Sequence, residues 1–166
     1  QSVYCIDPPH RRFSLQRRSS PPKVVTNPDG NETMNIDTLA LSNPLILAPL
    51  AGISDLPFRT IVRRFGCGLC HSEMVSADGI VRGQRKTLDI LVSRPDDRPL
   101  IAQIFGSDPG VLAGAAAIIE ARGLADAVDI NMGCPVKPVI RRGAGAALMR
   151  EPERVRLIVR EARRSI

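Results

Sequence analysis

Short apolar runs alternate with amphipathic stretches from residue 45 onward, and this alternation restricts the possible folds more than any other feature of the sequence. Four apolar runs have the length of buried strands, at residues 45–48, 69–72, 100–104 and 127–130. Each is followed by residues with a more helical pattern. Successive strand–helix units whose strands are apolar on both faces predict a parallel sheet covered by helices, so the expected fold class is α/β.

The expected helices carry local start and stop signals. Ser54 or Asp55 is placed to cap the first helix, and Asp108 opens the helix after the third strand, which Gly123 closes. A weaker, more polar helix is expected between residues 77 and 91. A last amphipathic helix lies near the end of the chain. These signals support the strand–helix order read from the apolar runs.

Two architectures fit this order of elements: a doubly wound sheet and a (β/α)8 barrel. A doubly wound sheet that binds a dinucleotide would carry a glycine-rich fingerprint after its first strand, which residues 48–52 (Ala-Pro-Leu-Ala-Gly) do not provide. A barrel requires eight strand–helix units and roughly 250 residues. With 166 residues, the chain is therefore expected to hold about the first four units of a (β/α)8 TIM barrel.

The beginning of the chain has a different character from the rest. Residues 1–33 are rich in Pro, Arg and Ser and show no apolar periodicity, which is typical of a flexible segment. They lack the apolar core of a secretory signal peptide. Met34 stands just before the first ordered pattern and is expected to be the natural start. We therefore divide the chain into a flexible leader, residues 1–33, and the N-terminal part of a truncated barrel domain, residues 34–166.

The composition narrows the classes of function. Hydrophobic residues make up 43% of the chain, which is ordinary for a globular protein. No run approaches the ~18 apolar residues of a membrane span, so no membrane is expected as a partner. Aromatic residues make up only 3%, which argues against the base stacking of RNA-recognition sheets. A net charge of +6 permits a polyanionic partner without requiring one. Four cysteines are too few for a disulfide scaffold and indicate a reducing compartment.

Small and polar residues follow the predicted strands. Parallel α/β folds bind their ligands at the carboxyl ends of the strands. The residues expected at that end of the sheet are Pro49, Leu50, Ala51, Glu73, Gln103, Asn131 and Cys134. They offer accessible backbone together with amide, carboxylate and thiol groups, which suit a flat heteroaromatic ligand that needs hydrogen bonds along its edge.

The most specific segment of the sequence is Asp-Ile-Asn-Met-Gly-Cys-Pro-Val-Lys at residues 129–137, followed by Gly-Ala-Gly at residues 143–145. Earlier motifs are Ala-Pro-Leu-Ala-Gly-Ile-Ser-Asp (48–55), Phe-Arg (58–59), Ser-Glu-Met (72–74) and Gln-Ile-Phe-Gly-Ser (103–107). In sequence, order and spacing these motifs resemble those of the tRNA-dihydrouridine synthases, from about residue 36 to the end. Leu50 stands where this family usually has Met, a change that conserves volume.

The resemblance implies a flavin-dependent reductase that converts particular uridines of tRNA to 5,6-dihydrouridine. Reduced FMN would pass a hydride from N5 to C6 of the uracil, Cys134 would donate a proton to C5, and NADPH or NADH would reduce the flavin again. A thiol is a reasonable acid near neutral pH. Matched motif by motif, the cofactor-binding residues would be Pro49, Leu50, Ala51, Gln103 and Asn131.

The resemblance also implies a tRNA-binding surface around that site. The substrate-binding residues would be Glu73, Asn131, Lys137, Arg141 and Arg142. A uridine inside folded tRNA has to be unstacked to reach such a pocket, so base flipping is expected. The full-length enzyme is expected to be a cytoplasmic monomer. By contrast, Arg59, Arg63 and Arg64 are expected to mark the solvent face of the first helix.

A Cys-x-x-Cys motif at residues 67–70, followed by His71, invites a metal or redox interpretation. One such pair supplies two ligands where a structural zinc site normally needs four, and no second pair follows. We therefore expect buried cysteines on the second strand and no metal site.

The remaining parts of such an enzyme are expected to be absent from this chain. The resemblance implies a flavin-contacting Lys on the fifth strand, a later His, glycine-rich loops for the FMN phosphate and a helical tRNA-binding domain, all beyond Ile166. The chain alone is expected to bind FMN weakly and to lack synthase activity. Two alternatives stay open: an inactive half-barrel or interaction module, and an FMN barrel that acts on a free pyrimidine.

Overall fold

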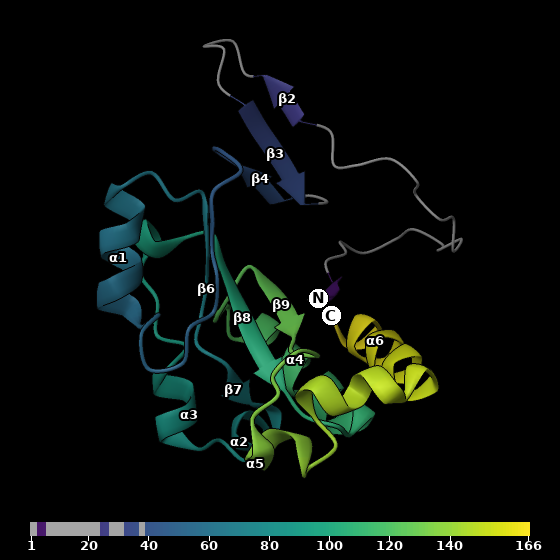
Figure 1. Cartoon of the computed structure of the whole chain (residues 1–166). Coiled ribbons are helices and arrows are strands. Elements are labelled where there is room, and N and C mark those ends of the chain that lie inside the picture. Colours follow the sequence, from purple (N-terminus) through teal and green to yellow (C-terminus); the bar gives the residue numbers. More distant parts are fainter. Residues whose placement is uncertain (1–2, 6–23, 27–31, 37–38) are drawn as a thin grey trace.

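A parallel sheet forms the centre of the molecule. The computed structural model describes residues 3–5, 24–26, 32–36 and 39–166 (Figure 1). The main sheet has the strand order β1-β9-β8-β6-β5, with β7 paired to β8. Its parallel strands are β5 (Ile46–Leu47), β6 (Leu69–His71), β7 (Val75–Ser76), β8 (Leu100–Phe105) and β9 (Ala127–Ile130). The α/β class with a parallel sheet is confirmed.

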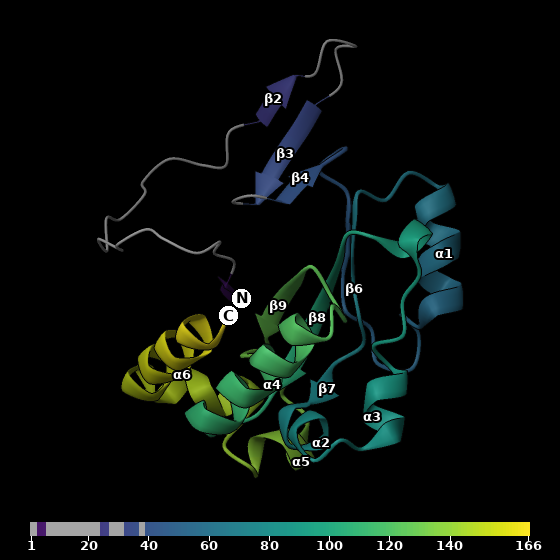
Figure 2. The same ribbon diagram turned by 180° about the vertical axis from the view of Figure 1, so that it is seen from behind.

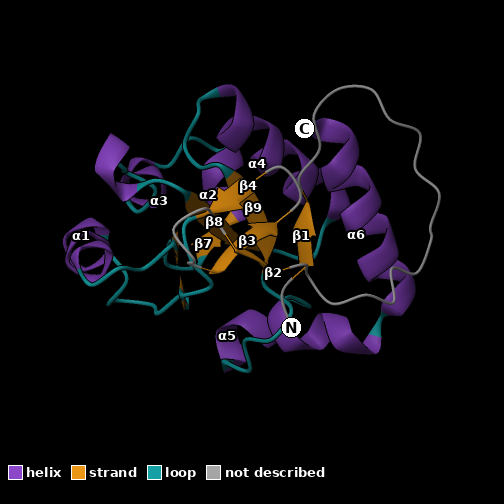
Figure 3. Cartoon of the chain, turned by 90° about the horizontal axis from the view of Figure 1, so that it is seen from above, coloured by secondary structure: helices purple, strands orange, loops and turns teal. Residues whose placement is uncertain are grey.

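Helices follow the strands in the predicted order. They are α1 (Leu56–Arg64), α2 (Ala77–Val81), α3 (Arg85–Asp89), α4 (Pro109–Ala121), α5 (Lys137–Ile140) and α6 (Pro152–Ser165), with 3-10 helices η1 (Pro95–Asp97) and η2 (Gly145–Arg150). The weak helix expected over residues 77–91 is two short helices, with Gly83 between them at a φ of +64°. Helices α4 and α6 pack against each other beside β8 and β9 (Figure 2). Seen from above, α1, α4 and α6 lie around the outside of the strands (Figure 3).

The side chains of β8 divide between two faces of the sheet. Ala102 and Ile104 belong to the core cluster formed with helices α2, α4 and α6. Ile101 belongs to a second cluster, which includes Leu69 of β6. Because side chains alternate along a strand, Gln103 lies on the same side as Ile101. We call this side, opposite the helix-facing core, the inner face of the sheet.

The helices begin where the sequence signals predict. Asp55 caps α1 by accepting a hydrogen bond from the backbone N–H of Phe58 at 2.9 Å. Asp108 caps α4 in the same way, from the N–H of Val111 at 2.8 Å. Ser54, the other candidate for the first cap, is buried, and its hydroxyl bonds the loop before the helix instead.

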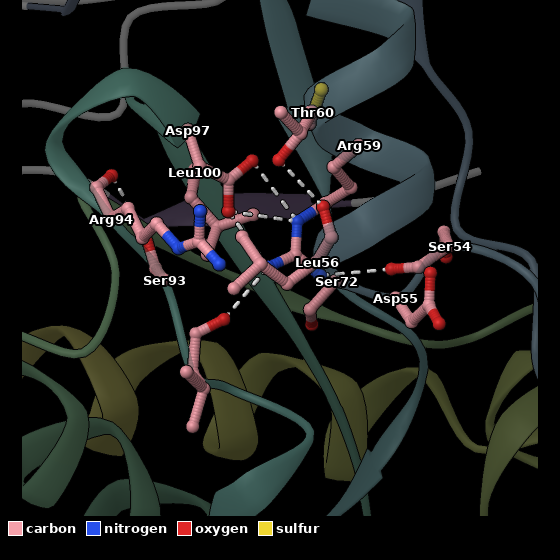
Figure 4. A network of polar contacts seen from close by, with 12 residues as sticks. Ser54, Asp55, Leu56, Arg59, Thr60, Ser72, Ser93, Arg94, Asp97 and Leu100 are labelled. Atoms are coloured by element: carbon pink, nitrogen blue, oxygen red, sulfur yellow. Dashed lines mark hydrogen bonds and ion pairs between the residues drawn. The ribbon is translucent and has the colours of Figure 1, made fainter.

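The expectation that the arginines of α1 face solvent is wrong for Arg59. Its side chain is completely buried. Its guanidinium donates to the Asp97 carboxylate from Nε at 3.0 Å and from Nη2 at 2.7 Å (Figure 4). Arg63 is half-buried and donates to the backbone carbonyl of Cys67, whereas Arg64 is exposed. A buried ion pair therefore joins α1 to η1.

Further strands come from the first part of the chain. An antiparallel sheet is formed by β2 (Val24–Thr26), β3 (Glu32–Ile36) and β4 (Leu39–Leu41), and Leu41 packs into the inner-face cluster. Strand β1 (Val3–Cys5) pairs antiparallel with β9. Most of the expected flexible leader, residues 1–33, lies outside the described residues, and Met34 lies within β3. In the described part of the chain, every helix is too short or too polar to cross a lipid bilayer.

Candidate functional site

A row of hydrogen-bonded side chains joins Asp129 of β9, Gln103 of β8 and Asn131, which directly follows β9. Gln103 donates from Nε2 to Asp129 Oδ2 at 2.6 Å, and Asn131 donates from Nδ2 to Gln103 Oε1 at 2.9 Å. Gln103 and Asp129 are register partners in the β8–β9 pair, so the sheet itself brings them together. Both are buried, whereas Asn131 is partly exposed. Two predicted site residues, Gln103 and Asn131, are thus in direct contact.

Asn131 also holds the turn that carries Cys134. Its Oδ1 accepts from the backbone N–H of Gly133 at 3.2 Å and from that of Cys134 at 2.9 Å. An Asn side chain that bonds the backbone just ahead of it fixes the path of a turn. Cys134 itself is partly exposed. Its backbone is therefore fixed from the strand end while the residue stays accessible.

Gly145 fixes the backbone on the other side of Cys134. Its φ is +59°, and an added Cβ would lie 2.6 Å from the carbonyl oxygen of Cys134 and 2.9 Å from Val139 Cγ1. Glycine adopts a positive φ at little cost and leaves room for this approach. The Cys134 carbonyl also accepts from the N–H of Ala146 at 3.0 Å. The glycine-rich segment noted in the sequence thus packs directly on the cysteine turn.

Glu73 points toward the loop that follows β5. Its Oε2 accepts from the backbone N–H of Gly52 at 2.6 Å. The neighbouring Ser72 hydroxyl donates to the Glu73 carbonyl and accepts from the backbone N–H of Gln103 at 3.1 Å. The Glu73 side chain therefore links the segment after β6 to the loop after β5. No hydrogen bond between described residues joins its side chain to Asn131.

The predicted backbone contact segment, residues 49–51, is accessible. Leu50 is 41% exposed, and Ala51 is exposed as well. The backbone N–H and carbonyl of Leu50 both bond the Ser54 hydroxyl, which holds this loop in place. The loop offers a small, ordered surface at the carboxyl end of β5.

Exposed basic side chains follow Cys134 in the chain. Lys137, Arg141 and Arg142 are all exposed, on or just after α5. The Arg142 carbonyl accepts from the Ser107 hydroxyl at 2.7 Å, which anchors this segment to the loop after β8. Sequence reasoning missed Arg150, the last residue of η2. This residue lines the same pocket as Arg141. This open pocket of about 350 Å³ is lined by Pro135, Ile140, Arg141, Ala146, Ala147 and Arg150.

Sequence reasoning also missed Asp129, although a charged residue inside an apolar strand was a usable signal. One of its oxygens, Oδ1, is buried without a hydrogen-bond partner in the described part of the chain. His71 Nε2 lies 3.9 Å from Asp129 Oδ2, and His71 Nδ1 is 3.0 Å from the Leu47 carbonyl oxygen. Burial lowers the pKa of His71 from its usual value of 6.5 in spite of these neighbours. The neutral imidazole is therefore favoured.

The two cysteines of the Cys-x-x-Cys motif are close to each other. Their Sγ atoms are 3.8 Å apart. Cys70 is buried on β6, as predicted, whereas Cys67 is partly exposed. Burial raises the pKa of the Cys70 thiol to about 12, so this thiol is protonated at neutral pH. In the residues that the structure describes, no three His, Cys, Asp or Glu side chains are grouped to hold a metal ion.

Known proteins are similar to this chain over most of the described residues. A family model described as Dihydrouridine synthase (Dus) matches residues 46–166. The chain is 45% identical over 118 residues to a tRNA-dihydrouridine synthase B of Pseudomonas aeruginosa, which covers 71% of this chain and 35% of that protein. It is 41% identical over 132 residues to a probable tRNA-dihydrouridine synthase of Rhodobacter capsulatus, covering 73% of this chain and 37% of that one. The chain therefore spans just over a third of the length of these curated relatives.

Proposed function

Since the chain belongs to the dihydrouridine synthase family, we propose that it is part of an enzyme that reduces particular uridines of tRNA to 5,6-dihydrouridine. The observation that carries the proposal is the setting of Cys134. Asn131 Oδ1 holds the Cys134 N–H at 2.9 Å, while the residue stays partly exposed. A cysteine whose backbone is held just after a strand, and which stays partly exposed, suits proton transfer to a base bound at the carboxyl ends of the strands.

In the proposed reaction, the C5–C6 double bond of the uracil gains a hydride at C6 and a proton at C5. The S–H bond of Cys134 breaks as the C5–H bond forms, and solvent then protonates the thiolate again. The role requires a protonated thiol at the start, in contrast to a nucleophilic cysteine, which reacts as the thiolate. When bound, FMN that NADPH or NADH has reduced supplies the hydride.

The side chains at the strand ends suit an isoalloxazine ring, whose edge carries both hydrogen-bond donors and acceptors. The amide nitrogens of Gln103 and Asn131 each use one N–H in the row described above and have a second one. The accessible loop after β5 adds backbone and small apolar surface. We therefore propose that the flavin-binding residues are Pro49, Leu50, Ala51, Gln103 and Asn131.

The basic segment after Cys134 supports tRNA as the substrate. The exposed side chains of Lys137, Arg141 and Arg142, together with Arg150, follow the cysteine turn and are available to bind the phosphates beside an unstacked uridine. Exposed Lys and Arg side chains bind phosphates without reading the sequence. Glu73 and Asn131 would border the uracil from the strand ends. The proposed partner is tRNA rather than a free pyrimidine.

The parallel sheet supports a barrel architecture for the whole enzyme. We propose that β5, β6, β8 and β9 are the first four strands of a (β/α)8 barrel. Leu45 and Ile46 are 59% and 38% exposed at the β5 edge, where a closed barrel would continue. Phosphate sites of such barrels follow strands seven and eight, so this chain alone would bind FMN weakly and be inactive. The whole enzyme would act as a monomer in the cytoplasm.

A chimera tests the function. Residues 46–166 would replace the aligned segment of the Pseudomonas aeruginosa relative, and dihydrouridine in unmodified tRNA would be measured by mass spectrometry in the presence of FMN and NADPH or NADH. We expect the chimera to be active, and Cys134→Ala to lower its rate about 100-fold, because general acid catalysis is typically worth about 10²–10⁴. Cys67→Ala is the matched control, because Cys67 precedes the amino end of β6, whereas the proposed site lies toward the carboxyl ends of the strands.

Two results would contradict the proposal. A Cys134→Ala chimera with unchanged activity would remove Cys134 from the reaction. A chimera that reduces free uridine as efficiently as tRNA would favour a free pyrimidine as the substrate.

A further inference from the structure

The carboxylate of Asp129 has no part in the reaction proposed above, yet it begins the hydrogen-bonded row that ends at Cys134. The side chain lies on the inner face of the sheet and is completely buried. Only Oδ2 has a hydrogen-bond donor in the described chain, namely Gln103 Nε2 at 2.6 Å. A buried carboxylate with an unsatisfied oxygen costs stability. Such a cost calls for a function that offsets it.

The Asp129 carboxylate determines which way the Gln103 and Asn131 amides point; we call this the direction of the row. An ionised carboxylate only accepts hydrogen bonds, so Gln103 has to turn its NH₂ group toward Asp129. The Gln103 carbonyl oxygen then faces Asn131 and accepts from Nδ2 at 2.9 Å. This leaves the Asn131 carbonyl oxygen for the N–H groups of Gly133 and Cys134. Each amide orientation thus follows from the one before it.

We propose that Asp129 is a positioning residue: its charge fixes the orientations of the Gln103 and Asn131 amides and, through them, the backbone that carries Cys134. The inference rests on the proposed function in so far as Cys134 is the proton donor. Two members of the row are shielded from water, because Gln103 is only 3% exposed and Asp129 is completely buried. Without water as a competitor, the orientation is set by the protein alone.

A neutral side chain at position 129 would remove the direction of the row. An Asn amide both donates and accepts, so it bonds Gln103 in either orientation. The Gln103 and Asn131 amides would then populate both orientations. In one of them, Asn131 presents NH₂ to the N–H groups of Gly133 and Cys134, and these two hydrogen bonds are lost.

Asp129→Asn in the full 166-residue chain tests this inference without any turnover. Two quantities would be measured: the hydrogen-exchange rates of the Gly133 and Cys134 amides by NMR, and the alkylation rate of Cys134 by peptide mass spectrometry. We expect both amides to exchange about tenfold faster, the effect of losing a typical hydrogen bond. The alkylation rate of Cys134 should change together with them.

Asp97→Asn is the matched control. Asp97 is also a completely buried carboxylate, but its partner is Arg59, away from the row. The control should destabilise the fold while the Cys134 alkylation rate and the Gly133 amide exchange stay unchanged under native conditions. An equal effect in both variants would show general loosening and would overturn the positioning role.

A double substitution tests the direction itself. In Asp129→Asn with Gln103→Glu, the carboxylate moves to position 103, where it accepts from both neighbouring amides. Asn131 must then keep Nδ2 toward position 103 and Oδ1 toward Cys134. We expect the exchange rates of the Gly133 and Cys134 amides to return to within about threefold of the parent chain, a difference smaller than the loss of one typical hydrogen bond.

The outcomes separate this inference from the proposed function. Unchanged amides in Asp129→Asn, or a double variant that restores nothing, would overturn the positioning role and leave the Cys134 chemistry untouched. If Asp129→Asn does not fold, the same measurements are made on Gln103→Met, which removes the hydrogen bonds that Gln103 makes to Asp129 and Asn131. Unchanged exchange rates of the Gly133 and Cys134 amides in Gln103→Met would also overturn the positioning role of Asp129. Loss of the proposed function is detected separately, by an active Cys134→Ala chimera.

Discussion

At the scale of single residues, the cysteine turn depends on a contact that leaves no room for a methyl group. We expect Gly145→Ala to lower the free energy of unfolding by about 2–5 kcal/mol, the sum of left-handed backbone strain and overpacking against the Cys134 carbonyl. Gly123→Ala is the control, because Gly123 has a similar φ of +58° but nothing within 4 Å of its added Cβ. Urea unfolding measures both losses. Equal losses would show that only backbone strain matters.

His71 makes stability depend on pH in a defined direction. Burial lowers its pKa in the folded chain below the usual 6.5, so the unfolded chain binds the proton more readily. Stability from this group is therefore complete above pH 6.5 and is lost as the pH falls from there toward the folded pKa. We expect the parent chain to lose more unfolding free energy between pH 7.5 and 5.5 than His71→Gln does. Parallel curves for the two chains in urea titrations would contradict this.

Local motifs were sufficient to single out the candidate site residues that lie near one another in the structure. Asn131 and Cys134 follow β9 in one specific segment, and Asn131 bonds both Gln103 of β8 and the backbone of Cys134. Asp129 and Arg59 were missed because their roles depend on partners in other elements. The carboxylate that pairs with Arg59 lies in η1, far along the chain, and an isolated helix pattern cannot reveal such a partner.

At the scale of elements, local patterns were sufficient for most of the sheet and its helices. The strand expected over residues 127–130 has those same bounds, and the caps of α1 and α4 are the acids that the sequence offers. The strand expected over residues 45–48 is only two residues long, as β5 pairs on one side with β6 alone in the described chain. Pairing between strands, which no local pattern contains, decides how far a strand extends.

The attachment of α1 depends on the Arg59–Asp97 ion pair. We expect Arg59→Met to lower the free energy of unfolding by about 3–5 kcal/mol, because it leaves the buried Asp97 carboxylate without its partner. Arg64→Met on the same helix is the control and should change stability by less than about 0.5 kcal/mol, since Arg64 is exposed. Urea unfolding followed by circular dichroism measures both. A loss below about 1 kcal/mol for Arg59→Met would show that the ion pair does not hold α1 in place.

At the scale of the whole molecule, β1 connects the first described residues to the edge of the main sheet. We expect removal of residues 1–33 to speed hydrogen exchange at those β9 amides that are not bonded to β8, because their edge becomes free. Amides between β6 and β8 should be unaffected and serve as the internal control. Mass spectrometry after deuterium labelling measures both. Unchanged protection throughout β9 would support the leader as a segment outside the fold.

The pairing of β1 with β9 also sets an order of events during protein synthesis. Val3 pairs with Ile130, so the two strands are separated by most of the chain. The ribosome releases β1 long before its partner exists, whereas each strand–helix unit can form as soon as it emerges. Pairing across so long a loop is slow compared with local contacts. We therefore expect the helix-covered parallel strands to assemble first, and β1 to pair with β9 only after these strands have formed.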